Sequence, residues 1–321
     1  MAALFQGLLR ASVIARCVTL LFAVVVLSGI VYAQDGGTAV TILPRLARPS
    51  VAPRSSIRID VNLVLVPVMV TDPYQRPIAG LHQQDFRVSE DGVQQTISQF
   101  FSEEAPLSIG IVFDASNSMH HKIDASREAI REFLRLSIPG DEFFLLKFSD
   151  RPESVRGFTS DLDELGGALE SIQPAGWTSL YDAIYSGLHQ MKRARFGRKA
   201  LLVLSDGGDN NSRYTENEIK ELVKEEDARV FAISIFDKSP SLAAIAEESG
   251  GRAFRVRSLD ELPDLINKLS AEIHSQYVLG YSPTNRDRDG KYRHVNVQLL
   301  PPQGIARPSL SWKHGYYSPV Q

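Results

Sequence analysis

Four uninterrupted apolar runs, with helical patterns between them, constrain the fold of this chain more than any other feature of its sequence. The runs occupy residues 107–113, 143–148, 200–204 and 230–235. A strand that is apolar at every position is buried on both faces, and parallel strands joined by helices are covered in that way. The pattern predicts an α/β fold with a doubly wound, mostly parallel sheet, in which 155–158 form an antiparallel edge strand.

The sequence on either side of the predicted α/β domain has the pattern of β-strands. Apolar and polar residues alternate over 57–65, which is typical of a half-buried strand, and Pro67 suggests an edge or a bulge. Other short strand patterns cover 277–281, 294–299 and 310–312. Each flank alone is small for independent stability, so we predict that 57–104 and 276–321 pair into one small β-sandwich, into which the α/β domain of 105–275 is inserted.

The first 33 residues differ from the rest of the chain. Arg10 and Arg16 precede a largely apolar run over 18–32, and Ala33 offers a small residue at a plausible cleavage point. This pattern predicts a secretory signal over 1–33, and therefore a secreted, periplasmic or cell-envelope protein. The alternative is an uncleaved membrane anchor, but the run is shorter than the roughly 20 residues that a bilayer core requires. We expect association with a membrane only in that case.

Composition limits both the stabilising chemistry and the partners. The single cysteine, Cys17, lies inside the predicted signal, so the mature chain can form no disulfide and depends on its core and on any bound metal. The formal net charge is −3, and removal of 1–33, which contain two arginines and no acidic residue, makes it −5. Nucleic acid is therefore not expected as a partner, because its binding requires a basic face. Residues 34–56, with three prolines and two glycines, predict a flexible linker.

Polar side chains gather at one edge of the predicted sheet. Asp114, Ser116 and Ser118 follow its first buried strand, Asp206 follows its third, and Thr178 precedes a helix. Ligands of open α/β folds bind outside the carboxyl ends of the strands. Hydroxyl, carboxylate and water oxygens are the ligands that Mg2+ prefers. We therefore predict a metal site made by these five residues, with Mg2+ as its ion and Mn2+ or Ca2+ as alternatives.

A family resemblance supports this site. Asp114, Ser116 and Ser118 match the Asp-x-Ser-x-Ser signature of von Willebrand factor type A domains, and the chain resembles that family over about residues 105–275. The flanks resemble the subgroup known as von Willebrand factor A related domains of acidobacterial type. The segments that carry this second resemblance are Leu81, Asp85-Phe86, Glu90-Asp91-Gly92, Tyr277 to Tyr281 and Gly315-Tyr316-Tyr317.

The resemblance implies a metal-ion-dependent adhesion site. Ser116, Ser118 and Thr178 would coordinate the ion directly or through water, and Asp114 and Asp206 would act directly or as outer acceptors. Because neutral hydroxyls dominate such a shell, the ion stays electrophilic, and an Asp or Glu of a partner protein can complete its octahedron. The expected function is a non-enzymatic adhesion module that binds an acidic group of a partner protein, with neither nucleic acid nor lipid as its ligand.

Two other functions remain as alternatives. A Mg2+-dependent hydrolase or phosphotransferase of the haloacid dehalogenase type also has an Asp at the end of its first strand. It needs a second acid two residues later, where this chain has Ser116, and the common hydrolytic and phosphate-loop motifs are absent from the sequence. The other alternative is a structural envelope or matrix protein whose metal only stabilises the fold.

Several neighbours of the predicted site allow a second interpretation. His120 and His121 lack the spacing of a zinc site and are predicted to be solvated loop residues. Trp177 could contact the partner or pack in the core. The polar residues 209–211 could orient the site, but after Gly207-Gly208 they are predicted to be simple loop formers.

Overall fold

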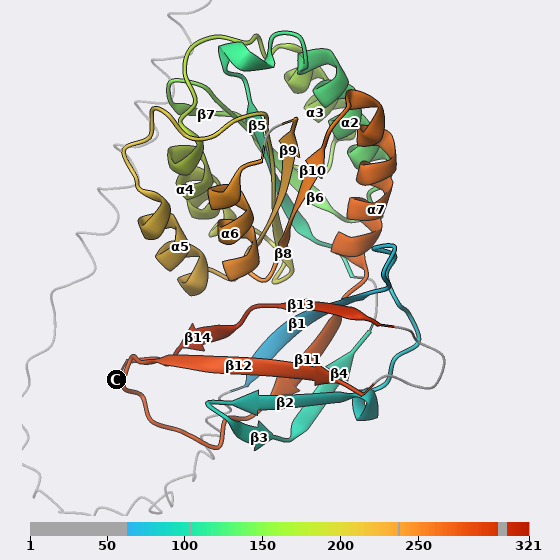
Figure 1. The fold of residues 1–321 in the computed structure, drawn as a ribbon, viewed down its shortest axis with the longest axis vertical. Coiled ribbons are helices and arrows are strands. Elements are labelled where there is room, and N and C mark those ends of the chain that lie inside the picture. Colours follow the sequence, from blue (N-terminus) through green and yellow to red (C-terminus); the bar gives the residue numbers. More distant parts are fainter. Residues whose placement is uncertain (1–62, 103–104, 237, 301–306, 321) are drawn as a thin grey trace, which may run out of the picture. The chain divides into compact units, whose positions relative to one another are not determined.

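The computed structural model describes residues 63–102, 105–236, 238–300 and 307–320 (Figure 1). The predicted signal over 1–33, the predicted linker over 34–56 and the start of the first predicted strand lie outside the described residues. Among the helices of the described segments, none combines the length and the apolarity needed to cross a bilayer.

A six-stranded sheet forms the centre of the α/β domain, with the strand order β10-β9-β8-β5-β6-β7 (Figure 1). Its strands are β5 (Ser108–Asp114), β6 (Glu142–Phe148), β7 (Pro152–Thr159), β8 (Lys199–Ser205), β9 (Arg229–Ile235) and β10 (Arg252–Val256). All neighbours are parallel except β7, which runs antiparallel to β6 at the edge. The predicted fold class is therefore confirmed, including the antiparallel edge strand.

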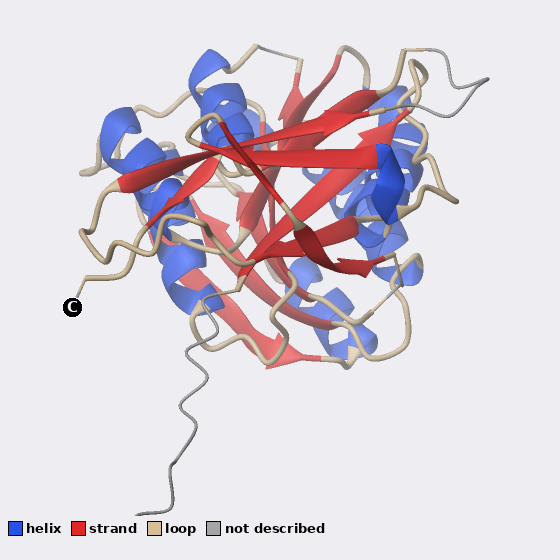
Figure 2. Cartoon of the chain, turned by 90° about the horizontal axis from the view of Figure 1, so that it is seen from below, coloured by secondary structure: helices blue, strands red, loops and turns tan. Residues whose placement is uncertain are grey.

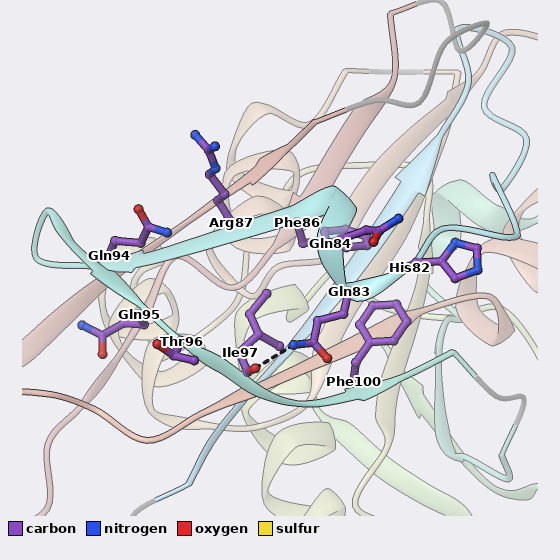
Figure 3. Close-up of a pocket in the computed structure, with 10 residues that line it drawn as sticks. All are labelled: His82, Gln83, Gln84, Phe86, Arg87, Gln94, Gln95, Thr96, Ile97 and Phe100. Carbon is purple, nitrogen blue, oxygen red and sulfur yellow. Dashed lines mark hydrogen bonds between the residues drawn. The ribbon is translucent and has the colours of Figure 1, made fainter.

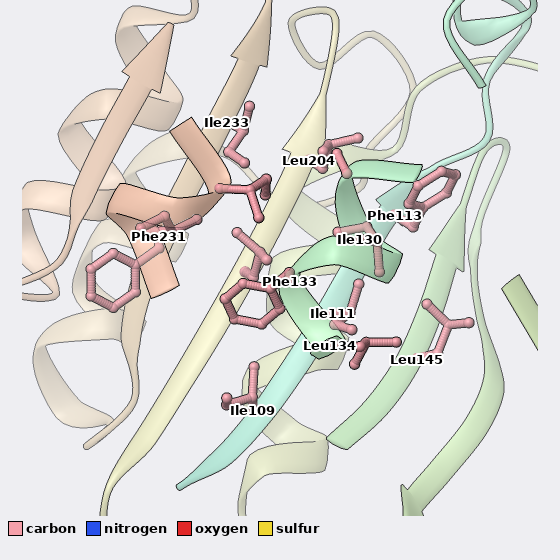
Figure 4. Close-up of a cluster of buried hydrophobic side chains, with 14 of the residues drawn as sticks. Ile109, Ile111, Phe113, Ile130, Phe133, Leu134, Leu145, Leu204, Phe231 and Ile233 are labelled. Carbon is pink, nitrogen blue, oxygen red and sulfur yellow. The ribbon is translucent and has the colours of Figure 1, made fainter. Parts of the chain in front are cut away.

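Helices cover both faces of this sheet because side chains of a strand alternate between the two faces. Ile111 of β5 packs in one apolar cluster and its neighbour Val112 packs in the other. The first face carries α2 (Ile123–Arg135), α3 (Leu162–Glu170) and α7 (Leu262–His274), and the second carries α4 (Leu180–Met191), α5 (Glu216–Glu225) and α6 (Pro240–Glu248). In Figure 4, Phe133 of α2 lies over the sheet among the apolar side chains of β5, β8 and β9.

Side-chain caps mark the start of α3 and α5. Asp161 accepts hydrogen bonds from the amides of Asp163 and Glu164 at the start of α3. Thr215 and Glu218 form a capping box at the start of α5. A side-chain acceptor satisfies an amide that has no partner within the first turn, which fixes the position at which each helix starts.

Strands from both flanks of the α/β domain make two antiparallel sheets, with the orders β13-β1-β11-β4 and β14-β12-β2-β3 (Figure 1). Figure 2 shows the strands in red and the helices in blue. The first flank supplies β1 (Val64–Thr71), β2 (Phe86–Glu90), β3 (Val93–Gln95) and β4 (Ile97–Phe101). The second supplies β11 (Tyr277–Tyr281), β12 (Tyr292–Leu299), β13 (Ser309–Trp312) and β14 (Gly315–Tyr317). Side chains of both sheets share one apolar cluster, so the two sheets form a sandwich. Short 3-10 turns occur at η1 (Gln83–Asp85), η2 (Asn117–Met119) and η3 (Leu259–Glu261).

Pro67, which was predicted to lie at an edge or a bulge, is in β1, a strand with β13 on one side and β11 on the other. The register explains why the proline is tolerated. β13 pairs with β1 only from Val68 onward, whereas Pro67 is matched with Val278 of β11. Pro67 therefore lies where β1 is paired on one side only, and its missing N–H breaks no ladder to β13.

Candidate metal centre

Asp114 holds the loop that follows β5 in place through hydrogen bonds. It is the last residue of that strand, and its carboxyl group is buried. Its Oδ1 accepts a hydrogen bond from the amide of Ser116 (2.8 Å), and its Oδ2 accepts one from the hydroxyl of Ser205 (2.6 Å). Burial raises the pKa of Asp114 to about 6, against the opposing effect of the hydrogen bonds from Ser205 and Ser116. A nearby cation would favour the ionised form of this carboxyl group.

Ser116, Ser118 and Asp206 lie together, although they come from two loops. The Oγ atoms of Ser116 and Ser118 are 3.0 Å apart, and the hydroxyl of Ser118 donates to Asp206 Oδ1 over 2.8 Å. Asp206 directly follows β8, which is the parallel neighbour of β5. The carboxyl ends of neighbouring parallel strands adjoin, and this geometry brings the two loops into contact.

A third loop carries Thr178. Gly176 has a φ of +77°, and a side chain at this position would collide with the carboxylate of Asp150. The same carboxylate accepts the amide of Trp177 at 2.8 Å. The amide of Thr178 donates to the side-chain oxygen of Asn210, also at 2.8 Å. The loop is thus held by polar groups on both sides.

Main-chain hydrogen bonds tie this third loop to the other two. The amide of Ala175 donates to the carbonyl of Ala115 (2.8 Å), and the amide of Asn117 donates to the carbonyl of Gly176 (3.1 Å). The amide of Asn210 donates to the carbonyl of Thr178 (3.0 Å). The structure therefore joins Ser116, Ser118 and Asp206 through their side chains, and it places Thr178 in a loop bound to both of theirs.

The chemistry of these groups fits a hard divalent cation. The side chains of the five predicted residues offer oxygen atoms as their only ligands: three residues carry a hydroxyl and two carry a carboxylate. Mg2+ and Ca2+ bind oxygen ligands of these kinds. Asp206 Oδ2 already attracts a cation, because the ammonium group of Lys122 contacts it. Within the described residues, no group of three or more His, Cys, Asp or Glu side chains is arranged to hold a metal. A site here would depend on hydroxyl ligands.

Sequence reasoning missed two residues around these loops, Ser205 and Lys122, and it weighed Asn210 as a residue that orients the site without choosing that interpretation. Ser205 donates to Asp114, Asn210 fixes the loop of Thr178, and Lys122 contacts Asp206. Ser205 could have been identified, since it is the last residue of β8 and directly precedes the predicted ligand Asp206. Lys122 gave no such signal. The interpretation of 209–211 as simple loop formers was incomplete, because Asn210 orients the amide of Thr178.

The other neighbours lie at the surface. His120 and His121 are exposed, and their rings stack on each other with centroids 5.5 Å apart. Trp177 is 65% exposed, so the alternative that it packs in the core is wrong. An indole beside the loops that carry Ser116, Ser118 and Asp206 is therefore accessible to another molecule.

A separate groove of about 890 Å3 lies on the sandwich. Figure 3 shows its lining, with Gln83 donating to the carbonyl of Ile97 and the ring of Phe100 close by. None of the loops that carry the five predicted ligands contributes to this groove. The groove is thus separate from the candidate metal centre.

Part of the α/β domain is similar to known proteins. Residues 109–208 match the sequence model of the von Willebrand factor type A domain. The search of the curated proteins gave no match. Proximal thread matrix protein 1 from the mussel byssus is 19% identical with a TM-score of 0.50, over 58% of this chain and 51% of that one. This chain therefore matches about half the length of the mussel protein.

Two other solved structures have slightly lower TM-scores. A structure of the same mussel protein with a zinc-occupied MIDAS motif is 22% identical with a TM-score of 0.47, over 58% of this chain and 50% of that one. A von Willebrand factor type A structure from Catenulispora acidiphila is 12% identical with a TM-score of 0.49, over 81% and 74% of the two chains. The family match over 109–208, the six-stranded sheet and the Asp-x-Ser-x-Ser loop lead to one assignment. The chain carries a von Willebrand factor type A domain.

Proposed function

We propose that this chain is an exported, non-enzymatic adhesion module that holds a divalent cation, Mg2+ by preference, and binds an acidic group of a partner protein through it. The observation that carries the proposal is the contact between Ser118 and Asp206, which joins hydroxyl and carboxylate oxygens from two strand ends. The Thr178 loop is bonded to both of these loops. Ser116, Ser118 and Thr178 would hold the ion, with Asp114 and Asp206 as direct or outer acceptors.

The charge of the ligand set favours an acidic partner. Three of the five groups are neutral hydroxyls, and both oxygens of Asp114 already accept hydrogen bonds from Ser116 and Ser205. The protein would therefore leave part of the dication's charge uncompensated. A carboxylate from an Asp or Glu of the partner would replace a bound water and supply the missing negative charge. The ion would therefore attract the partner's carboxylate electrostatically.

The exposed indole of Trp177 suits the same role. Aromatic side chains dominate the energetics of many protein interfaces, and this one directly precedes Thr178. Its apolar surface would contact the partner around the captured carboxylate. This combination favours a protein partner over a free small acid, which would gain little from the indole.

A structural role for the metal is the second candidate, and the burial of Asp114 beneath the loops favours it. In that case the ion would stabilise the fold without binding a partner. Both functions suit an exported protein, in keeping with the predicted signal over 1–33. A phosphotransferase remains a weaker candidate, since Ser116 stands where that chemistry needs an acid.

A binding experiment with two controls separates these functions. Immobilised protein is incubated with native envelope extract or medium, in Mg2+ and in chelator, beside the variants Asp206→Asn and Ser98→Ala. Ser98 is an exposed serine of β4 on the sandwich. Adhesion predicts a partner that is lost in chelator and with Asp206→Asn but kept with Ser98→Ala, while chelator changes the melting temperature of the original protein little.

A different result would favour the structural role. In that case chelator would lower the melting temperature strongly, and any captured protein would remain equally bound in chelator and with Asp206→Asn. Partner capture that ignores the chelator would contradict the adhesion proposal even if the protein binds Mg2+.

A further inference from the structure

Lys122 contacts the carboxylate at the centre of the candidate metal site. The residue precedes α2, and its ammonium group forms an ion pair with Asp206 Oδ2. The side chain of Lys122 is 18% exposed and that of Asp206 is 1% exposed. The other oxygen of the same carboxylate, Oδ1, accepts the hydroxyl of Ser118. Lys122 and Ser118 thus share the two oxygens of Asp206.

The ammonium group of Lys122 also contacts Phe236, the residue that follows β9. It lies 5.2 Å from the ring centroid of Phe236, within the range of a cation–π interaction. Phe236 has a φ of +70°, an uncommon conformation for a residue with a side chain. Its amide donates to the carbonyl of Val256 (2.8 Å), and its carbonyl accepts from the guanidinium of Arg255 (2.6 and 2.9 Å). These bonds hold the ring in place despite the backbone conformation.

We propose that Lys122 is a built-in cation that competes with the divalent ion for Asp206 and so sets the affinity of the metal site. The inference rests on the proposed function, because it concerns the same site. A nearly buried carboxylate needs a positive partner, and Lys122 supplies one from within the chain. A divalent ion that uses Asp206, directly or through water, meets the like charge of Lys122 a few ångströms away. Binding of the ion therefore requires the lysine to move off the carboxylate.

Two consequences follow from this competition. The protein keeps its loops together at low metal concentration, because Lys122 bridges Asp206 and the start of α2. It also binds the metal more weakly than the same oxygen set would without the lysine. Occupancy then responds to the metal concentration of the surroundings and does not stay saturated.

Calorimetric titration of Mg2+ and Mn2+ at fixed pH and salt tests the proposal. Lys122→Met removes the charge but keeps most of the side-chain length, and Lys122→Arg keeps the charge. Lys147→Met is the control, because the ammonium group of Lys147 pairs with Glu153 (3.2 Å) across β6 and β7 and with none of the five predicted ligands. We expect Lys122→Met to bind the ions about tenfold more tightly or better, since a repelling charge is gone. Lys122→Arg and Lys147→Met stay within about twofold of the original protein.

The melting temperature in chelator gives an independent readout. Lys122→Met lowers it, because Asp206 is left without its positive partner, and saturating Mg2+ restores more stability in this variant than in the original protein. If Lys122→Met does not fold, Lys122→Gln is titrated in its place with the same expectation.

The failures of the two proposals differ. Unchanged or weaker metal binding in the folded Lys122→Met or Lys122→Gln variant overturns the role of Lys122 but leaves the proposed function standing. If neither the original protein nor these variants bind Mg2+ or Mn2+, the proposed function itself is overturned, and the competition with it.

Discussion

The hydroxyl of Ser118 donates to Asp206 Oδ1 over 2.8 Å, although 88 positions separate the two residues in the chain. This contact is compatible with metal binding. A serine that coordinates an ion through an oxygen lone pair still has its proton, which it can donate to a carboxylate. Asp206 would then orient Ser118 toward the ion, as outer groups orient metal ligands in many sites.

Replacement of Ser118 by Ala tests this arrangement. We expect Mg2+ affinity to fall by about tenfold or more, because one ligand and its hydrogen bond to Asp206 are lost together. The fold should remain intact, since Ser118 is exposed. Calorimetric titration measures the affinity, with Ser98→Ala as the control. Equal affinity in the two variants would remove Ser118 from the site.

Replacement of Trp177 by Ala separates partner binding from metal binding. Trp177 is 65% exposed, so its loss should change the melting temperature little. Partner affinity should fall by about tenfold or more if the indole anchors the interface, while Mg2+ affinity stays unchanged. Tyr74→Ala, at an exposed aromatic residue of the sandwich, is the control. Undiminished partner binding would show that the indole lies outside the interface.

Replacement of Phe133 by Ala tests the core of the α/β domain. Phe133 is buried and packs edge-to-face on Phe143, with ring centroids 6.4 Å apart. Loss of this ring leaves a cavity under α2, and the free energy of unfolding should drop by about 3 to 5 kcal/mol. Denaturant unfolding measures the change, with the exposed Phe101 as the control position. A loss below about 1 kcal/mol would contradict this packing.

Replacement of Asp289 by Asn should have an effect that depends on pH. The hydrogen bond from the Ser318 hydroxyl (2.8 Å) is the first cause that lowers the pKa of Asp289 to about 2, with help from Lys291 and Arg293. A carboxyl group with a lowered pKa stabilises the folded state above about pH 4 and loses that effect as the pH falls toward 2. Melting temperatures should therefore be lower for the variant at pH 6, and the difference should vanish near pH 2. A difference that persists or grows in acid would exclude this cause.

The buried sheet was predictable because its strands carry one signal along their whole length. β5 is apolar between Ser108 and Asp114, and a run of this kind has few alternatives to a covered parallel strand. Tyr277–Tyr281 was likewise predicted with the bounds that β11 has. β10 was missed, since Arg252 and Arg255 interrupt its apolar pattern. Their positions are favourable only in the tertiary structure, where Arg252 pairs with Glu272 and Arg255 binds the Phe236 carbonyl.

In the candidate site, too, local sequence pattern predicted some residues, and others depend on the tertiary structure. Asp114, Ser116 and Ser118 stand at a strand end, so local pattern was enough to single them out. The contact of Lys122 with Asp206 depends on how α2 begins beside β8, which no local pattern contains. The exposure of Trp177 was equally undetermined, because an indole beside a loop can face either way.

The central claim is that three loops hold one divalent cation, and the most direct test is an anomalous difference map of crystals grown or soaked with Mn2+. The account predicts a single strong peak within coordination distance of the hydroxyls of Ser116, Ser118 and Thr178, beside Asp206. The same crystals of Asp206→Asn should show a much weaker peak. A map at saturating Mn2+ with no peak among these residues, or with its only peak elsewhere, would contradict the account.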